Sequence, residues 1–437
     1  MRENKNNTDN ITLNTMKWGG MKAPLISVIL PCYNVAPYLP RCMKSLEEQS
    51  IGIENLELIF VDDASTDDGA TWNAILDFEA KYPNQVIAIQ HEENKKQGGA
   101  RNTGLRYASA EYVGFVDPDD WIERDMYKAL YDKAVEHDCE VVWCRMYTDA
   151  DTTKELKGIT TEGLSKDEIE EVEAEEIKEI NGLTTEGLSK DEIEEVQAEE
   201  IKELNGFKTE GLSKEKVEEA EESRNLITED LSKEKAEKKL EGLYVYEKSA
   251  VCGGNQRAEL AGSGVFTKLY RKNLILDNEI WFPEKVFYED NYWGTILACY
   301  VKRYYAMNDY LYHYCIRENS TAHLKNATQH LDYLLMEERT VDKYKEIGIF
   351  ERFYREIEME FLVKYYLKSI GLWAKYDHIP YELYRVLCEG VAKKFPDYPS
   401  NPYLQLPEYK FLKEMLPLSG KELSEEEWFL VGKLLKG

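Results

Sequence analysis

The sequence predicts an α/β protein in which a largely parallel sheet carries helices on both faces. Between residues 26 and 147, short apolar runs typical of buried strands alternate with longer amphipathic stretches typical of helices. Such alternation builds right-handed strand–helix–strand crossovers, which make neighbouring strands parallel. From about Gln329 onward the pattern is helical to the end of the chain, which predicts a helical C-terminal region.

Five strands and four helices are expected in the first part of the chain. The run ISVILP at 26–31 is largely apolar, as in strands buried on both faces, and an amphipathic helix is expected over 37–49. Further strands are expected at 56–63, 86–90, 112–117 and 141–147, and further helices at 69–82, 98–108 and 123–137. Mixed segments follow between about 255 and 320.

Composition and charge exclude several classes of protein. The 437 residues include 83 acidic and 55 basic side chains, a net charge of −28, so the chain is poorly suited to bind nucleic acid. No apolar run approaches the roughly 18 residues that a membrane span needs. The eight cysteines contain no Cys-x-x-Cys pair, which favours reduced thiols and a cytoplasmic protein. Residues 1–22 are polar, without the apolar core of a signal peptide, and are expected to be a disordered lead-in.

Residues 155–245 are expected to form a separate acidic insertion, because they contain an internal repeat. The segment TTEGLSKDEIEEVEAEEIKEINGL at 160–183 recurs almost unchanged after 24 residues, and a third copy begins at Lys208 and decays. Each of the first two copies has its own helix start and stop signals, and residues 155–242 carry a net charge of −16. Two interpretations stay open: short solvated or partly disordered helices, or an arm for self-association or for a protein partner through its narrow apolar stripe.

Polar residues follow three of the expected strands, at the point where each strand ends. The strand ends read Pro31-Cys32-Tyr33-Asn34, then Asp62-Asp63, then Asp117-Pro118-Asp119-Asp120. Ligands of open α/β sheets bind at the carboxyl ends of the strands. One such Asp could be a helix N-cap, but three clusters at successive strand ends indicate a binding site. Asp117 and Asp119 form an Asp-x-Asp pattern that can hold Mn²⁺ or Mg²⁺ through oxygen, with phosphate oxygens completing the shell.

A segment rich in glycine opens the helix before the fourth strand. In Gly98-Gly99-Ala100-Arg101-Asn102, helix N-terminal amides and one arginine suit a phosphate or a ribose, so Gly99, Arg101 and Asn102 are candidate contacts. The alternative is that the glycines only make a tight turn. The chain has neither a GxxxxGK[ST] loop nor a GxGxxG motif, which argues against P-loop and dinucleotide-binding folds.

Together these motifs resemble the family 2 inverting glycosyltransferases, which have the GT-A fold. The segments ISVILPCYNVAPYL, LIFVDDASTDD and GGARNTGLRYASAEYVGFVDPDDW carry the resemblance over about residues 25–148. The resemblance implies a nucleotide-sugar site. Its candidate binding residues are Pro31, Tyr33, Asn34, Asp62, Asp63 and Asp117. Asp63 would accept the uracil N–H of a UDP-sugar, Asp117 would face the ribose or the metal, and Asp119 would bind the metal directly.

A second, looser part of the resemblance covers about residues 255–320. The segment PEKVFYEDNYWGTILACY at 283–300 resembles the part of the family in which a Glu-Asp pair opens a helix and the aspartate is the general base. An inverting transfer needs a group that takes the acceptor proton during attack. The resemblance assigns this role to Asp290, with Glu289 as its neighbour or as the alternative base. The pair is otherwise explained as acidic residues favoured at a helix start. Arg317 or His313 is a candidate contact of the diphosphate or metal.

The predicted domains are a lead-in (1–22), a nucleotide-sugar-binding half (23–154), the insertion (155–245), an acceptor-side half (246–325) and a helical region (326–437). The resemblance implies metal-dependent, inverting transfer of a hexose from a UDP-sugar to a polysaccharide or lipid-linked oligosaccharide, with peripheral membrane contact. One alternative is a non-catalytic nucleotide-sugar-binding protein whose repeats are an interaction arm. Another is a nucleotidyltransferase, but PCYNVAPY lacks the expected glycine-rich loop with Lys or Arg.

Overall fold

The structure is a computed structural model that describes residues 23–150, 242–245, 264–316, 330–373 and 381–416, together with Ser424 and Trp428. All of these residues belong to one compact unit. The predictions for the lead-in, for the acidic repeats and for Arg317 concern residues outside this described part of the chain.

The first four strands of the sheet have the predicted parallel arrangement. They are β1 (Ile26–Cys32), β2 (Leu56–Asp62), β3 (Val86–Gln90) and β4 (Tyr112–Phe115). Their order in the sheet is β3-β2-β1-β4, and each neighbouring pair is parallel. The carboxyl ends of β1, β2 and β4 therefore lie at one edge of the sheet, as the sequence predicted.

Beyond β4 the sheet becomes mixed. The further strands are β5 (Trp121–Ile122), β6 (Val141–Ala150), β7 (Gly242–Val245), β8 (Lys268–Arg271) and β9 (Arg303–Ile316). The order continues β4-β8-β6-β9-β5, with β7 also paired with β9. The pairs of β8 with β4 and β6 are antiparallel, as are those of β9 with β5 and β7, whereas β6 and β9 are parallel. The α/β class is confirmed. Each antiparallel pair among the described strands includes at least one strand that follows residue 241.

Helices occupy the segments between these strands and most of the described C-terminal part. Those of the first part are α2 (Leu39–Glu47), α3 (Ala70–Lys81), α4 (Lys96–Tyr107) and α5 (Met126–Glu136), followed by α10 (Lys272–Asp277) and α11 (Glu289–Ala298). The C-terminal helices are α12 (His330–Glu346), α13 (Tyr354–Phe361), the π-helical η5 (Leu362–Lys368), α14 (Ser369–Trp373), α15 (Tyr381–Lys394) and α16 (Lys410–Met415). No helix in the described ranges is long and apolar enough to cross a membrane.

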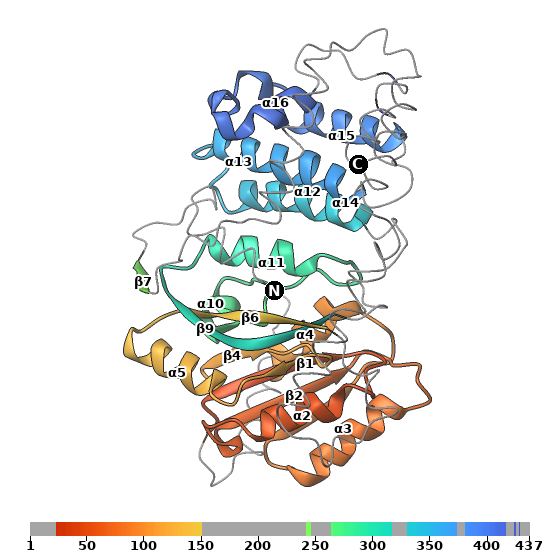
Figure 1. The fold of residues 1–437 in the computed structure, drawn as a ribbon, viewed down its shortest axis with the longest axis vertical. Helices are drawn as coiled ribbons and strands as arrows, with labels where there is room; N and C mark the ends of the chain where they lie inside the picture. The colour runs from red at the N-terminus through yellow and green to blue at the C-terminus, as the bar shows by residue number, and fades with distance from the viewer. Residues whose placement is uncertain are drawn as a thin grey trace, which may run out of the picture. The chain divides into compact units, whose positions relative to one another are not determined.

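Side chains that alternate along the buried strands enter two separate cores. Val28 and Leu30 pack in a cluster with residues of α2, α3 and α5. Ile29, which points to the other face, packs in a cluster with residues of α4 and α11. Figure 1 shows α2 and α3 on one side of the sheet and α11 on the other. Helices therefore cover both faces, which explains why every residue of β1 is buried.

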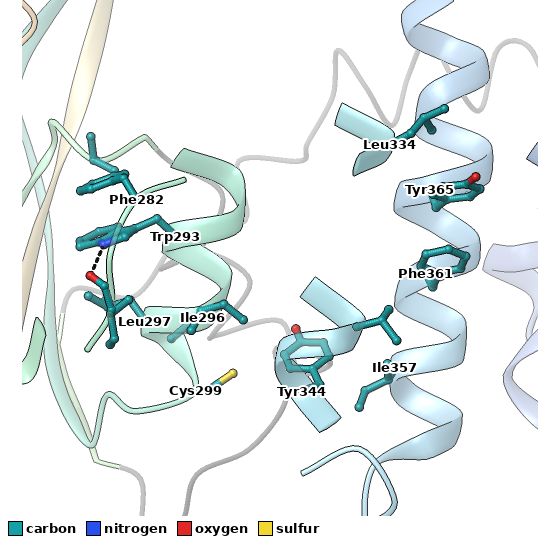
Figure 2. Packing of buried hydrophobic residues seen from close by; sticks show 14 of the residues in the cluster. Phe282, Trp293, Ile296, Leu297, Cys299, Leu334, Tyr344, Ile357, Phe361 and Tyr365 are labelled. Atoms are coloured by element: carbon teal, nitrogen blue, oxygen red, sulfur yellow. Dashed lines mark hydrogen bonds between the residues drawn. The ribbon is translucent and has the colours of Figure 1, made fainter. Parts of the chain in front are cut away.

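The second of these cores continues from the sheet through α11 into the C-terminal helices. On one side of α11, Trp293 stacks on Phe282 with ring centroids 4.4 Å apart, and its indole N–H donates to the carbonyl of Ile280 (2.9 Å). Figure 2 shows Ile296 and Cys299 on the side of α11 that faces Tyr344 of α12. Because both sides of α11 are packed, the helix that carries the predicted Glu-Asp pair is held between the sheet and the C-terminal helices.

Candidate active site

The loops after β1 and β2 are tied to each other at the edge of the sheet. Asn34 has a left-handed backbone (φ 53°), and its side chain donates to the Thr66 hydroxyl (3.2 Å) and accepts from the Thr66 amide (2.8 Å). The Asn34 amide donates to Ser65 (2.9 Å). Tyr33 beside it is 45% exposed. The structure thus brings the predicted residues of these two strand ends together and leaves the Tyr33 ring accessible.

The two aspartates after β2 are buried and engaged in different ways. The Asp62 carboxylate accepts from the Ser65 hydroxyl (2.5 Å) and from the Gln90 side chain (2.9 Å). One oxygen of Asp63 lies 2.7 Å from Nδ1 of His91 and 2.8 Å from the Lys95 amide. Asp62 therefore shapes the loop, and Asp63 is held firmly in place.

His91 is a residue of this site that the sequence analysis missed. Its second ring nitrogen, Nε2, lies 2.9 Å from the Thr103 hydroxyl, so the imidazole connects Asp63 to helix α4. His91 directly follows β3, and the carboxyl end of every parallel strand reaches the same edge of the sheet. That position was the available signal.

The Asp-x-Asp segment is fixed by hydrogen bonds from β9. The Tyr312 hydroxyl accepts from the Asp117 amide (3.2 Å) and donates to the Asp120 carboxylate (2.6 Å), which also accepts from the Cys315 amide (2.8 Å). Burial, helped by the charges of Asp119 and Asp117, raises the pKa of Asp120 to about 8. Asp119 is only partly buried, and its carbonyl accepts from Arg41 (2.9 Å). The segment concentrates negative charge at one place, which favours a bound cation.

Arg101 joins the two halves of the predicted site. Its guanidinium donates to Glu289 (2.6 Å) and to Asp117 (3.1 Å), and the residue is only 2% exposed. Burial alone would lower the pKa of this guanidinium, but the carboxylates of Asp117, Glu289 and Asp290 outweigh that effect and raise it. Arg101 was predicted to contact a phosphate or ribose. In the structure its guanidinium binds two carboxylates that lie 172 residues apart in the chain.

The Glu-Asp pair opens α11, and its two carboxylates have different surroundings. Glu289 is 4% exposed, and burial raises the pKa of its carboxyl although Arg101 opposes this. Asp290 is partly exposed, and its Oδ1 accepts from the adjacent Asn291 amide (2.9 Å). The described residues give its carboxylate no further hydrogen bond or ion pair. Of the two candidates for the base, Asp290 is the more accessible.

The glycine-rich segment lies inside α4 and packs against the loop before α11. A side chain at Gly98 would collide with the Pro283 carbonyl, so close approach of this loop requires glycine there. Because α4 begins at Lys96, the glycines are helical and do not make a tight turn. The Asn102 side chain donates to the Phe282 carbonyl (2.9 Å) and accepts from the Phe282 amide (2.9 Å). Asn102 thereby holds that loop, and its role toward a nucleotide stays a prediction, as does that of Gly99.

His313 lies beside the Asp-x-Asp strand end but has other partners. Its Nδ1 is 2.8 Å from Asp149 and its Nε2 is 2.9 Å from Glu123, and its ring stacks on Trp121 with a centroid distance of 3.5 Å. Both ring nitrogens are thus engaged by carboxylates. A contact of His313 with a diphosphate or metal stays a prediction.

An open sheet with carboxylates gathered at the ends of its parallel strands is typical of α/β enzymes that bind nucleotides. Residues 27–184 match the family model of Glycosyl transferase family 2. This match, which covers about a third of the chain, confirms the resemblance found in the sequence.

Several known proteins are similar to part of the chain. The glycosyltransferase GlyA of Streptococcus pneumoniae is 39% identical over 123 residues, which are 28% of this chain and 17% of that protein. The uncharacterized glycosyltransferase EpsJ of Bacillus subtilis is 35% identical over 124 residues, 28% of this chain and 34% of that protein. The poly(ribitol-phosphate) beta-glucosyltransferase of Bacillus spizizenii is 30% identical over 141 residues, which are 32% of this chain and 20% of that protein. The chain thus spans between 17% and 34% of the length of these relatives.

Solved structures show a looser likeness over more of the chain. S. aureus TarS 1–349 in complex with UDP-GlcNAc is 19% identical, has a TM-score of 0.46 and covers 92% of this chain and 93% of its own. The mannosyltransferase PcManGT of Pyrobaculum calidifontis in complex with GDP-Man and Mn²⁺ is 13% identical and has a TM-score of 0.42. The match covers 99% of this chain and 95% of that structure's chain.

Proposed function

We propose that the chain is a metal-dependent, inverting glycosyltransferase that moves a hexose from a UDP-sugar to a hydroxyl group of a polysaccharide or lipid-linked oligosaccharide. The observation that carries this proposal is the buried Arg101, which links Asp117 of the Asp-x-Asp segment to Glu289 of the Glu-Asp pair. A donor-side carboxylate cluster and a candidate base thereby belong to one site. The acceptor class is supported by similar proteins named for polymer synthesis, among them the poly(ribitol-phosphate) beta-glucosyltransferase.

The residues of the Asp-x-Asp segment suit a divalent metal that is shared with the donor. Among the described residues, no group of three or more His, Cys, Asp or Glu side chains forms a metal cage. Mg²⁺ is commonly held by one or two carboxylates plus substrate phosphates, so two aspartates are a sufficient protein contribution. Asp119 would be the direct ligand, with Asp117 beside it. The bound ion would supply positive charge that stabilises the diphosphate leaving group.

The other residues of the site have separate roles in this proposal. Asp63, held by His91 and the Lys95 amide, accepts the N–H of the uracil base. Asp290 takes the proton of the acceptor hydroxyl as that oxygen attacks the anomeric carbon. Glu289 and Arg101 keep the start of α11 at a fixed distance from Asp117. The base and the metal-binding carboxylates are thus separate groups, as an inverting displacement requires.

A donor screen with two variants tests this proposal. Purified protein with Mn²⁺ is offered each common UDP-hexose, with water or an octyl glycoside as acceptor, and UDP release is measured. We expect UDP release with one donor, and we expect Asp290→Asn to lower it by about 10²–10⁴-fold with unchanged UDP affinity. Glu289→Gln should lower it less. Tight UDP-sugar binding without release by the wild type would favour the non-catalytic alternative, and full activity of Asp290→Asn would remove Asp290 as the base.

A further inference from the structure

The residue before the Glu-Asp pair has an unusual backbone. Tyr288 is the N-cap of α11 and has φ 62° and ψ 23°, in the left-handed region. This region is unfavourable for a residue with a bulky side chain, and glycine or asparagine is the usual occupant. Such a conformation persists only where surrounding contacts hold it. The direction in which α11 begins, and with it the position of Asp290, therefore depends on what holds Tyr288.

The contacts that hold Tyr288 come from the first turn of α12. The Tyr288 hydroxyl shares a hydrogen bond with Nδ1 of His330, and its ring meets the Tyr333 ring edge-on at a centroid distance of 5.2 Å. His330 and Tyr333 are both buried, and the His330 ring packs edge-on against Trp373 of α14 (5.8 Å). The hydroxyl of Tyr288 is thus bonded to a side chain that the C-terminal helices immobilise.

The same turn of α12 also holds the residue before Tyr288. The Phe287 amide donates to the Asp332 carboxylate (2.9 Å), which pairs with Lys96 of α4 (3.6 Å). The Lys96 ammonium lies 3.4 Å from the centre of the Phe287 ring. Two consecutive residues at the start of α11 are therefore anchored to α12 and α4 by side chains.

From these contacts we infer that His330 is a positioning residue, which acts through the Tyr288 hydroxyl to hold Asp290 in place for proton transfer. The role of Asp290 as base rests on the proposed function, whereas the hold on the start of α11 does not. The C-terminal helices, which the sequence analysis treated as a region apart from the catalytic half, would then set the rate of the chemical step. Small displacements of a reacting group can lower a rate about a hundredfold, so a loose Tyr288 should matter.

Two measurements on matched variants test this inference. Tyr288→Phe and His330→Ala each remove the hydrogen bond, and His330→Asn keeps an acceptor near the position of Nδ1. The control is Tyr344→Phe, which likewise removes the hydroxyl of a buried tyrosine. Tyr344 is on α12, its hydroxyl donates to Glu360 (3.1 Å), and both residues are far from the Glu-Asp pair in the sequence. The first measurement is amide hydrogen exchange of residues 286–292. The second is UDP release with the donor identified in the screen, together with the KM for that donor.

We expect Tyr288→Phe and His330→Ala to raise exchange in 286–292 about tenfold and to lower kcat about tenfold, with KM for the donor within twofold. His330→Asn should recover most of both losses, and Tyr344→Phe should change neither. Wild-type exchange in Tyr288→Phe, or equal effects of Tyr344→Phe, would overturn the inference. If the wild type releases no UDP from any donor, the proposed function fails, and the exchange measurement still decides whether α12 holds the start of α11.

Discussion

Replacing Arg101 by methionine should destabilise the fold strongly and specifically. The substitution keeps most of the aliphatic stem but removes a guanidinium that pairs with Glu289 at 2.6 Å and with Asp117 at 3.1 Å. The side chains of Arg101, Glu289 and Asp117 are 3%, 6% and 13% exposed, so water cannot replace the lost partner. Two carboxylates that share one cation would be left close together without it.

The expected cost follows from this burial. Removing one partner of a buried ion pair costs about 3–5 kcal/mol, because an uncompensated charge stays behind. We expect a value in this range at pH 8. At pH 5.5 the cost should be smaller, because burial already raises the pKa of Glu289 and the loss of Arg101 would raise it further. Protonation of Glu289 then removes one of the two unpaired charges.

Urea unfolding of four proteins measures this effect. The wild type, Arg101→Met, Glu289→Gln and the double variant form a double-mutant cycle, and residues in direct contact should show a coupling free energy of about 0.5–3 kcal/mol. The control is Lys81→Met, because the Lys81–Glu47 pair (2.8 Å) is largely exposed and should matter far less. A loss below about 1 kcal/mol for Arg101→Met, or no coupling in the cycle, would refute the buried bridge between the two halves of the site.

Four further predictions concern the metal, the uracil base of the donor, the pH dependence of stability and the insertion. Chelation by EDTA should abolish UDP release and Mn²⁺ should restore it, and Asp119→Asn should lower turnover by orders of magnitude; full activity of Asp119→Ala in EDTA would contradict this assignment. Asp63→Ala should weaken UDP binding by about 1–3 kcal/mol in titration calorimetry, whereas unchanged affinity would show that the uracil base does not bind at Asp63. Because burial raises the pKa of Glu289 from 4.5 to about 7, the folded state keeps this proton to higher pH than the unfolded chain does. Its contribution to stability therefore falls as the pH rises through that window, and Glu289→Gln should flatten that part of the stability profile; an unchanged profile would argue against it. Replacing residues 155–242 by a short Gly/Ser linker should leave donor hydrolysis nearly intact, and an unfolded or inactive product would show that the insertion belongs to the core.

Most of the first part of the fold could be predicted from local patterns. Largely apolar runs such as ISVILP and LELIFVDD identify β1 and β2 because a strand buried on both faces is rich in apolar residues. The strand-end cluster could be predicted as well, because parallel strands deliver their carboxyl ends to one edge of a sheet. The family match over 27–184 confirms the resemblance that these motifs carried.

The partners within the site could not be predicted in the same way. Arg101 and Glu289 are 188 residues apart, and Asn102 and Phe282 are 180 apart, so no local spacing joins them. In the sequence, an arginine and an asparagine next to glycines at a helix start suit a phosphate as well as they suit protein partners. Only the packing of the loop before α11 against α4 removes both side chains from solvent and gives them protein partners.

The sequence by itself determined the strands, the helices between them and the polar residues at the strand ends, because these depend on periodicity and on the rule that parallel strands end together. The tertiary structure decided what those polar residues contact. It alone placed Tyr312 on the Asp-x-Asp segment, Arg101 between the two acidic motifs, and α12 against Tyr288. These contacts depend on how segments distant in the chain pack, and the free energy of such packing belongs to pairs of segments, so neither sequence segment reveals it alone.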